Sequence, residues 1–254
     1  MNAPLNSHRI VARSKAMTKI SIIIPTFKEA KYINQTLNCI EKLNGNIEVV
    51  LVETVSEETE ILENVVKKHE GVQLYKIKER GIAKAKNYGA QKAHSNILLF
   101  LDADVFVTKD VVKQVSRVFR DPSVIGATCN NYPIEPKNSE LLFFKFYNAL
   151  IRLVLSLPPT KFMHSRGEFI AVRKARFNRI GGFNEHLVCL EDADLAHRLS
   201  VSGKFIFIKD LVVYESMRRI RKLGLFRTIM LWFKNWLFYV VKNGVIIKEW
   251  EPIR

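Results

Sequence analysis

Short apolar runs alternate along the chain with longer segments in which apolar residues recur every three or four positions. The runs that predict strands cover residues 20–25, 47–52, 72–77 and 97–101. The segments between them predict helices over 29–43, from Ser56 onward and over 81–94. Regular alternation of this kind is typical of βαβ units, so the sequence predicts an α/β fold with a mainly parallel sheet flanked by helices.

The pattern becomes less regular after residue 104. A helix is expected over 111–119 and a further strand over 123–129, and a very apolar segment follows at 141–157. Lys145 and Arg152 lie seven residues apart in that segment, on one helical face. It is too short and too charged for a membrane span, which needs about 20 apolar residues. A core helix and a helix at a membrane interface both fit the pattern.

The C-terminal segment has a different character. No Asp or Glu occurs from Ser216 to Lys248, and a helix expected over 223–243 is rich in Trp, Phe and Leu. Arg227, Lys234 and Lys242 gather on one side of it, opposite a broad apolar face. A basic amphipathic helix of this composition is typical of membrane interfaces. The alternative is a helix packed on the domain with a solvated basic edge.

Composition narrows the range of partners. Hydrophobic residues make up 48% of the chain and charged residues 26%, which is ordinary for a globular protein. The formal net charge of +15 favours an anionic membrane surface or another polyanion, although it can also serve solubility. No nucleic-acid recognition motif accompanies the charge, so we expect no nucleic-acid partner.

The ends of the chain and its thiols suggest a location. Residues 1–16 contain no apolar core of a secretory signal, and we interpret them as a disordered tail or a start assigned too far upstream, with a transit peptide as the alternative. Cys39, Cys129 and Cys189 lack metal-ligand spacing and suit a reducing compartment. We therefore expect a catalytic domain over 17–215, a membrane-associating segment over 216–254, and a peripheral position on the cytoplasmic face of a membrane.

Two carboxylates mark a candidate ligand site. Asp102 and Asp104 follow the buried strand at 97–101, and the carboxyl ends of parallel strands are where open α/β sheets bind ligands. Carboxylates this close repel each other unless a cation lies between them, and hard oxygen ligands suit Mg²⁺ or Mn²⁺. The sequence thus indicates a metal that carries a phosphate ester, and a solvated Asp-rich turn is the alternative.

Four local motifs occur together with this pair. They are S-I-I-I-P-T-F-K-E at 21–29, G-I-A-K-A-K-N-Y-G at 81–89, G-G-F-N-E at 181–185 and L-E-D-A-D-L-A-H-R-L at 190–199. Their order and spacing resemble those of family 2 glycosyltransferases over residues 19–215. The resemblance implies a GT-A fold, in which a Rossmann-like sheet binds a nucleotide-sugar and a second half shapes the acceptor site.

The resemblance also implies roles for particular residues. Asp192 corresponds to the base that deprotonates the acceptor hydroxyl in an inverting transfer, with Glu191 as an orienting acid and Asp194 as a helix cap. A plain charged helix N-terminus is the alternative. The motifs assign the metal to Asp104 with Asp102, and the acceptor region to Gly181, Gly182 and Phe183. The residues expected on the donor side are Pro25, Thr26, Glu29, Glu53, Lys86, Asp102, Arg218 and Arg219.

Some of these donor assignments stay open at the level of sequence. Lys86 could contact the diphosphate, support the carboxylates, or be a solvated helix lysine. Arg218 and Arg219 could close over the phosphates or face a membrane. Glu53 replaces the Asp that many relatives use for the base, and Tyr214-Glu215 stands where a metal-binding His often occurs.

Together these features predict a metal-dependent inverting glycosyltransferase that uses a nucleotide-sugar donor. The apolar basic segments favour a membrane-associated acceptor, either a lipid-linked sugar or a polyprenyl phosphate. One alternative is a nucleotidyltransferase, which would need a glycine-rich phosphate loop that P-T-F-K-E at 25–29 lacks. The other is a non-catalytic membrane-binding protein built on a transferase fold.

Overall fold

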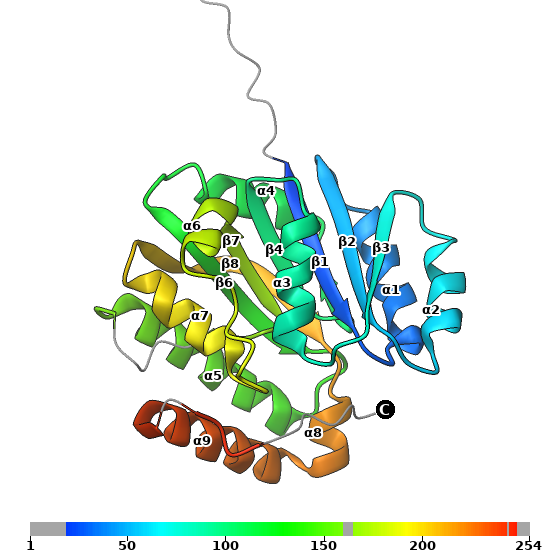
Figure 1. Cartoon of the computed structure of the whole chain (residues 1–254). Helices are drawn as coiled ribbons and strands as arrows, with labels where there is room; N and C mark the ends of the chain where they lie inside the picture. Colours follow the sequence, from blue (N-terminus) through cyan, green and yellow to red (C-terminus); the bar gives the residue numbers. More distant parts are fainter. Residues whose placement is uncertain (1–18, 160–164, 243, 248–254) are drawn as a thin grey trace, which may run out of the picture.

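A computed structural model describes residues 19–159, 165–242 and 244–247. Within them, an eight-stranded sheet in the order β3-β2-β1-β4-β7-β6-β8-β5 is covered by helices on both faces (Figure 1). The expectations for residues 1–16 and for the end of the 216–254 segment lie outside the described residues.

The first half of the chain forms a parallel sheet. Its strands are β1 (Ile20–Thr26), β2 (Ile47–Thr54), β3 (Val72–Ile77) and β4 (Ile97–Leu101), and its helices are α1 (Ala30–Glu41), α2 (Thr59–Val66) and α3 (Ile82–Lys92). All pairings among these strands are parallel, with Ile22 aligned to both Val49 and Leu99. The strands therefore end at one edge of the sheet, where Glu29, Glu53 and Asp102 lie close to the strand ends.

The second half makes the sheet mixed. It adds β5 (Val105–Val107), α4 (Val111–Val118), β6 (Val124–Pro133), α5 (Asn138–Ser156), β7 (Phe169–Arg173), α6 (Lys174–Arg179), α7 (Glu191–Ser200), β8 (Lys204–Glu215), α8 (Arg218–Leu223) and α9 (Leu225–Lys242). Strand β7 runs antiparallel to β4 and β6, while β8 is parallel to β6 and antiparallel to β5. The expected mainly parallel sheet is thus an accurate description of the first four strands, and the remainder is mixed.

Helix α3 lies unusually close to the sheet. A methyl group added at Gly89 would meet the Cγ2 atom of Ile23 at 2.5 Å and that of Val52 at 3.1 Å. Real Cβ atoms do not come that near to a neighbour, so only glycine permits this spacing between helix and sheet. One turn earlier on the same helix, Lys86 is completely buried.

Helices α5 and α9 run side by side below the sheet edge (Figure 1). The ring of Trp232 in α9 lies 6.4 Å from the rings of Phe143 and Tyr147 in α5, measured between centroids. No helix in the described part of the chain is both long and apolar enough to cross a bilayer.

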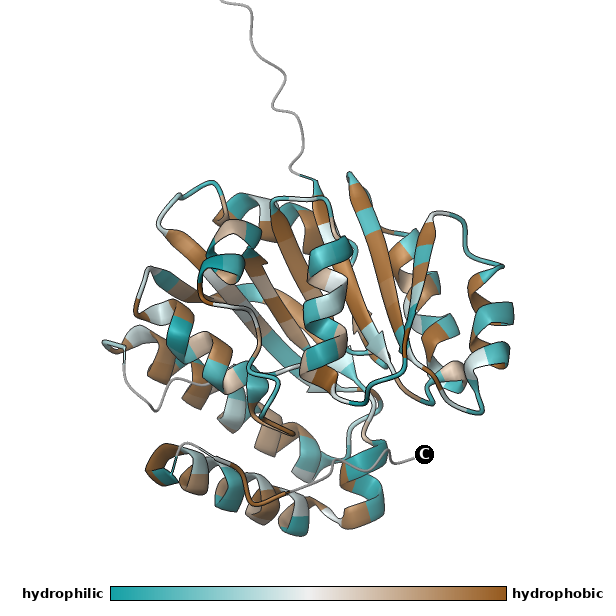
Figure 2. Ribbon diagram, in the orientation of Figure 1, coloured by the Kyte–Doolittle hydropathy of each residue, from teal (hydrophilic) through white to brown (hydrophobic). Residues whose placement is uncertain are grey.

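Helix α9 buries side chains that carry polar groups and exposes several large apolar ones. Its buried side chains are Thr228, Asn235 and Tyr239. Its large exposed apolar side chains are Phe226, Met230, Phe233, Leu237, Phe238 and Val241, and Arg227, Lys234 and Lys242 are exposed as well. Brown apolar positions therefore recur along the outside of this ribbon (Figure 2). Helix α5 also exposes apolar residues, including Leu142, Phe146 and Leu153, but it buries Phe144 and Ile151.

Candidate active site

The two aspartates predicted to bind metal emerge where β4 ends. The turn that carries them is held from α1, because the buried Thr36 hydroxyl donates a 2.7 Å hydrogen bond to the carbonyl of Ala103. Oδ1 of Asp102 is buried and has no hydrogen-bond partner. A buried carboxylate oxygen without a donor is costly, which makes this atom ready to accept a cation.

Lys86 lies between the two halves of the site. Its Nζ is 3.1 Å from Oε1 of Glu191 and 3.7 Å from Oδ1 of Asp102, and it also lies over the Phe183 ring. Burial alone lowers the pKa of Lys86, but Glu191, Asp102 and Asp192 raise it above its ordinary value, so the lysine stays charged. Of the readings left open by the sequence, the solvated lysine is wrong, and support of the carboxylates is what the geometry shows.

The second pair of acids begins helix α7. Glu191 and Asp192 follow Leu190, which has a left-handed backbone with φ of 62°. A bulky residue rarely adopts that conformation, so the turn is locally strained. Asp194 does not cap the helix as expected. It pairs with Arg198 at 2.6 Å and accepts a hydrogen bond from the Tyr239 hydroxyl, because it lies inside the first turn rather than before it.

The helix that was expected to begin at Ser56 begins three residues later. Helix α2 begins at Thr59, and the Thr59 hydroxyl accepts from the Ser56 backbone N–H. The turn before the helix is therefore longer than the sequence suggested.

Arg218 comes from the C-terminal part of the chain and contacts Asp104, the aspartate predicted to bind metal. Its guanidinium binds both carboxylate oxygens of Glu29, at 2.7 and 2.6 Å, and its Nε lies 3.2 Å from Oδ2 of Asp104. The ring of Tyr32 stacks against it at 4.4 Å. Arg219 is near enough to Arg218 for that neighbour, together with burial, to lower the pKa of Arg219. Both arginines therefore belong to the site.

A further ion cluster was not predicted from the sequence. Arg166, only 4% exposed, makes a two-pronged contact with Glu168 at 3.2 and 3.1 Å and also binds Glu215. Its Nη1 has no hydrogen-bond partner. Burial raises the pKa of Glu168, but Arg166 outweighs it and holds that pKa at about 2. Glu215, which takes the position of the expected histidine, is thus engaged by an arginine.

Crowding of acids shifts the protonation of the whole site. Burial raises the pKa of Asp102 to about 6, with Lys86 opposing and Glu168 and Glu191 adding to the rise. Burial likewise raises the pKa of Asp104 to about 7, with Arg218 opposing. The pKa of Asp192 lies well above its ordinary value because of burial and the neighbouring Glu191.

Glu53 lies at the end of β2, away from this cluster. It is fully buried, and its Oε1 accepts from the hydroxyls of Ser56 and Thr59 at 3.3 and 3.2 Å. Its Oε2 has no partner, and burial raises the pKa of this carboxyl. Thr26 lies at the end of β1, next to β2, and its hydroxyl donates to the Val52 carbonyl. Pro25 precedes it on β1.

A cavity of about 770 Å³ opens beside the acids. Its polar end is formed by Asp102, Arg166, Glu168, Glu191 and Asp192, and its walls come mostly from α5 and α9. Asp102 and the predicted base Asp192 thus meet at one cavity, although they lie about ninety residues apart in the chain, whereas Asp104 is not among its lining residues.

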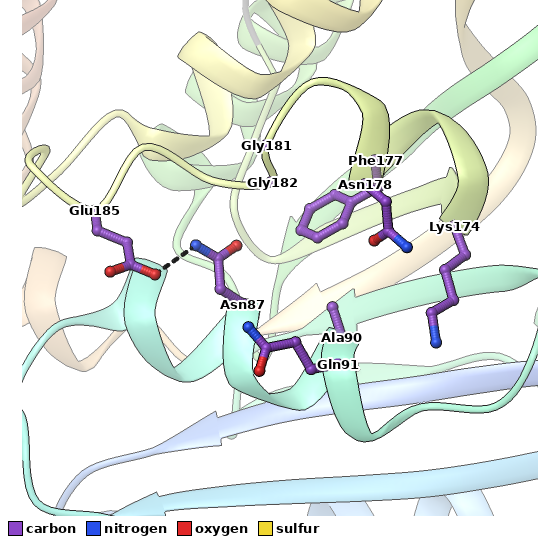
Figure 3. Close-up of a pocket in the computed structure, with 9 residues that line it drawn as sticks. All are labelled: Asn87, Ala90, Gln91, Lys174, Phe177, Asn178, Gly181, Gly182 and Glu185. Carbon is purple, nitrogen blue, oxygen red and sulfur yellow. Dashed lines mark hydrogen bonds between the residues drawn. The ribbon is translucent and has the colours of Figure 1, made fainter.

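Two of the three predicted acceptor residues lie elsewhere, whereas the ring of Phe183 lies against Lys86. Gly181 and Gly182 line a second pocket of about 440 Å³, together with Asn87 and Glu185 (Figure 3). The Asn87 amide donates to the Phe183 carbonyl and to Glu185, and it accepts from the Phe183 N–H. A Cβ at Gly182 would meet the Asn87 oxygen at 2.5 Å. These contacts fix the loop before α7, and an acceptor-binding role for the three residues stays a prediction.

The oxygen ligands offered by the two aspartates fit a divalent cation. Asp102 and Asp104 supply carboxylate oxygens, and the buried Oδ1 of Asp102 has no hydrogen-bond donor, with the Lys86 ammonium 3.7 Å away. The part of the chain that the structure describes holds no ready cluster of three or more His, Cys, Asp or Glu ligands. A metal here would therefore complete its coordination with oxygens from the donor phosphates and water, as Mg²⁺ commonly does.

Sequence comparison places these residues among known proteins. The sequence model for glycosyl transferase family 2 matches residues 21–179. An uncharacterized glycosyltransferase of Haemophilus influenzae is 33% identical over 121 residues, which are 46% of this chain and 48% of the relative. Poly(ribitol-phosphate) beta-N-acetylglucosaminyltransferase TarS of Staphylococcus aureus is 28% identical over 108 residues, which are 39% of this chain and 18% of the relative. The chain thus spans half or less of the length of these two relatives.

Solved structures agree on the fold. Mannosyltransferase PcManGT from Pyrobaculum calidifontis, in complex with GDP-Man and Mn²⁺, superposes with a TM-score of 0.66 at 23% identity, covering 85% of this chain and 64% of that one. TarS 1–349 of S. aureus in complex with UDP-GlcNAc gives 0.62 at 19% identity, covering 87% and 72%. At these identities the likeness establishes the GT-A fold, which confirms the expected fold class.

Proposed function

The chain belongs to glycosyl transferase family 2, and from that membership we propose that it moves a sugar, with inversion, from a nucleoside-diphosphate sugar to a membrane-associated acceptor. The observation that carries the proposal is the meeting of Asp102 with Glu191 and Asp192 at one cavity, where the buried Lys86 lies between Asp102 and Glu191.

On the donor side, the unpartnered Oε2 of Glu53 suits an imino N–H of a nucleobase. Uracil, thymine and guanine each offer such a donor. The PcManGT complex contains GDP-Man and one TarS complex contains UDP-GlcNAc, so relatives of this fold use nucleotide-sugars with both kinds of base. Arg218 and Arg219 would face the diphosphate.

The residues fit Mg²⁺ or Mn²⁺, held by Asp104 and Asp102. When bound, such an ion neutralises charge that develops on the leaving diphosphate. Arg218 contacts Asp104, and both its Nη atoms are bound by Glu29. The guanidinium is therefore already placed beside the position that the phosphates would take.

Asp192 is the proposed base. It lines the cavity, and a cation bound nearby would favour its ionised form, which can accept the proton of an acceptor hydroxyl. The acceptor hydroxyl would lose its proton to Asp192 as its oxygen attacks the anomeric carbon, and the bond from that carbon to the diphosphate breaks. Glu191, bound by Lys86, fixes the start of α7 so that Asp192 points into the cavity.

The membrane proposal rests on α9 and α5. Phe226, Leu237 and Val241 are 78%, 47% and 64% exposed, although they belong to a helix whose buried residues are polar. Exposed Arg227 and Lys234 lie among them, which suits an anionic lipid surface on the cytoplasmic side. A site at the surface of a membrane would meet acceptors that are anchored in it.

Transfer by purified protein tests the reaction. We expect Mn²⁺-dependent transfer of radiolabelled sugar from a UDP-, GDP- or dTDP-sugar into a membrane lipid extract. Asp192→Asn should reduce turnover by about two to four orders of magnitude while donor affinity changes little. Asp210→Asn, at an exposed position of β8, is the matched control and should behave as wild type. If Asp192→Asn loses donor binding and keeps its turnover, Asp192 binds the donor and is not the base.

Sedimentation with liposomes tests the location. The full chain should sediment with anionic vesicles at low salt and be released only in part by high salt, because the aromatic contribution is not screened. Replacing Phe226, Leu237 and Val241 together by Ser should leave it in solution, and none of the three lines the cavity. A wild-type protein that stays in solution with anionic vesicles would contradict the location.

A further inference from the structure

The cavity between α5 and α9 has two chemically different ends, and we infer from them which class of acceptor it takes. The inference is that the cavity binds the apolar chain of a glycolipid acceptor whose neutral, hydroxyl-bearing headgroup lies at Asp192, in preference to a lipid phosphate. It rests on the proposed function and narrows the acceptor.

The walls of the cavity are apolar. They are formed chiefly by Phe143, Tyr147 and Val154 from α5 and by Ile229, Trp232 and Trp236 from α9. The volume of about 770 Å³ is of the size that encloses small organic ligands in proteins. A sugar alone would leave these walls facing water, whereas an alkyl or isoprenoid chain would cover them.

The mouth of the cavity is apolar as well. Phe146, Leu150, Leu157 and Phe233 line the cavity and are also 67%, 42%, 54% and 51% exposed. These residues belong to the same two helix surfaces that expose apolar side chains outward. Apolar side chains therefore connect the inside of the cavity with the exposed surface of the protein, which gives an apolar chain a path into it.

The polar end disfavours a phosphate. Asp102, Glu168, Glu191 and Asp192 line it, and the cation that the described residues add to this lining is Arg166. Arg166 is already matched by Glu168 and Glu215. A phosphate headgroup would thus lie against carboxylates with no uncompensated cation among the described lining residues.

A hydroxyl suits the same end. Its proton passes to the Asp192 carboxylate as its oxygen bonds to the anomeric carbon, and the diphosphate leaves with the electrons of the broken bond. A phosphate oxygen is ionised already and would have no use for the base. Nη1 of Arg166, which has no partner, can donate to a headgroup oxygen.

Binding of simple amphiphiles tests both the site for the apolar chain and the preference for a neutral headgroup, and it needs no nucleotide-sugar. Trp232 and Trp236 lie in the cavity wall, so their fluorescence reports occupancy in a full-length Trp250→Phe background. The probes are butyl, octyl and dodecyl β-glucoside and dodecyl phosphate, each below its micelle-forming concentration. Each methylene can raise affinity by up to about fourfold, so dodecyl glucoside should bind at least tenfold more tightly than octyl glucoside.

Two matched variants locate the chain. Val154→Phe fills the cavity and should weaken dodecyl glucoside binding at least tenfold. Leu153→Phe, at the neighbouring position that is 59% exposed and outside the lining, should leave binding unchanged. Thermal melting of both variants checks that they fold. If either variant does not fold, the series of glucosides of different chain length still tests the proposal on the protein without the Val154 or Leu153 change.

Dodecyl phosphate should bind at least tenfold more weakly than dodecyl glucoside at pH 8. Affinity that does not depend on chain length, or an equal loss in the two variants, would overturn the chain site. Equal or tighter binding of the phosphate would overturn the choice of headgroup. Failure of the proposed transferase activity is separate, because it would appear only in the transfer assay.

Discussion

Replacing Lys86 by Met should destabilise the protein strongly. Lys86 is completely buried, and its ammonium lies 3.1 Å from Glu191 and 3.7 Å from Asp102. Methionine preserves most of the side-chain volume and removes the charge. The two carboxylates would then face each other and Asp192 without a cation, in a site where burial already raises the pKa of Asp102 to about 6.

The size of the effect follows from this geometry. Removing one partner of a buried ion pair typically costs about 3–5 kcal/mol, because the remaining charge stays buried and unpaired. For a chain of this length, such a loss should lower the melting temperature by about 10 °C. The cost should shrink below about pH 5, where the carboxylates take up protons and no longer need the ammonium.

Urea unfolding followed by circular dichroism at pH 8 measures the cost. Lys86→Arg retains the charge and should keep most of the stability. The double variant Lys86→Met with Glu191→Gln should recover part of the loss, since one of the stranded charges is gone. The reasoning is refuted if Lys86→Met costs less than about 1 kcal/mol, or if Glu191→Gln makes it worse.

Two further predictions concern the aspartate turn. The pKa of Asp104 is raised from 3.8 to about 7, so its protonated form is favoured by folding, and the resulting stability is complete below about pH 4 and lost as the pH rises through 7. With a chelator at pH 8, Asp104→Asn should therefore melt at a higher temperature than wild type, yet lose any stabilisation by Mn²⁺ and nucleotide; a variant that melts lower without metal would contradict the shift. Thr36→Val should destabilise the fold by about 1–3 kcal/mol by stranding the Ala103 carbonyl, and should weaken Mn²⁺ binding measured by calorimetry; unchanged Mn²⁺ affinity would show that the turn does not need this bond.

Local pattern was enough for much of the first half of the fold. The strands expected over 72–77 and 97–101 have those bounds in the structure, because a short apolar run bounded by polar residues has few other uses. Strands β5, β7 and β8 were not predicted over their ranges. β5 has three residues, and β7 contributes only F-I-A-V-R directly before a helix. Their pairing partners are distant in sequence, so tertiary contacts define them.

In the site too, local sequence motifs identified some residues, whereas others are defined only by tertiary contacts. The motifs identified Asp102, Glu191 and Asp192, which the structure brings to one cavity, and Asp104, which pairs with Arg218. They did not identify Arg166, whose partner Glu215 lies 49 residues away. The polar run R-G-E at 166–168, placed just before an apolar strand, was the available signal. Whether a lysine is solvated or buried likewise depends on the helix around it, as Lys86 shows.

The close contact of α3 with the sheet has an evolutionary consequence. Gly89 leaves no room for a methyl group against Ile23, and the depth of α3 sets the depth of Lys86 one turn away. Positions 23 and 89 should therefore diverge together in descendants of this sequence, with Ala at 89 tolerated only beside a smaller residue at 23. The glycine that ends the 81–89 motif would then be inherited as a spacer that keeps a charge at the right depth, although it touches no substrate.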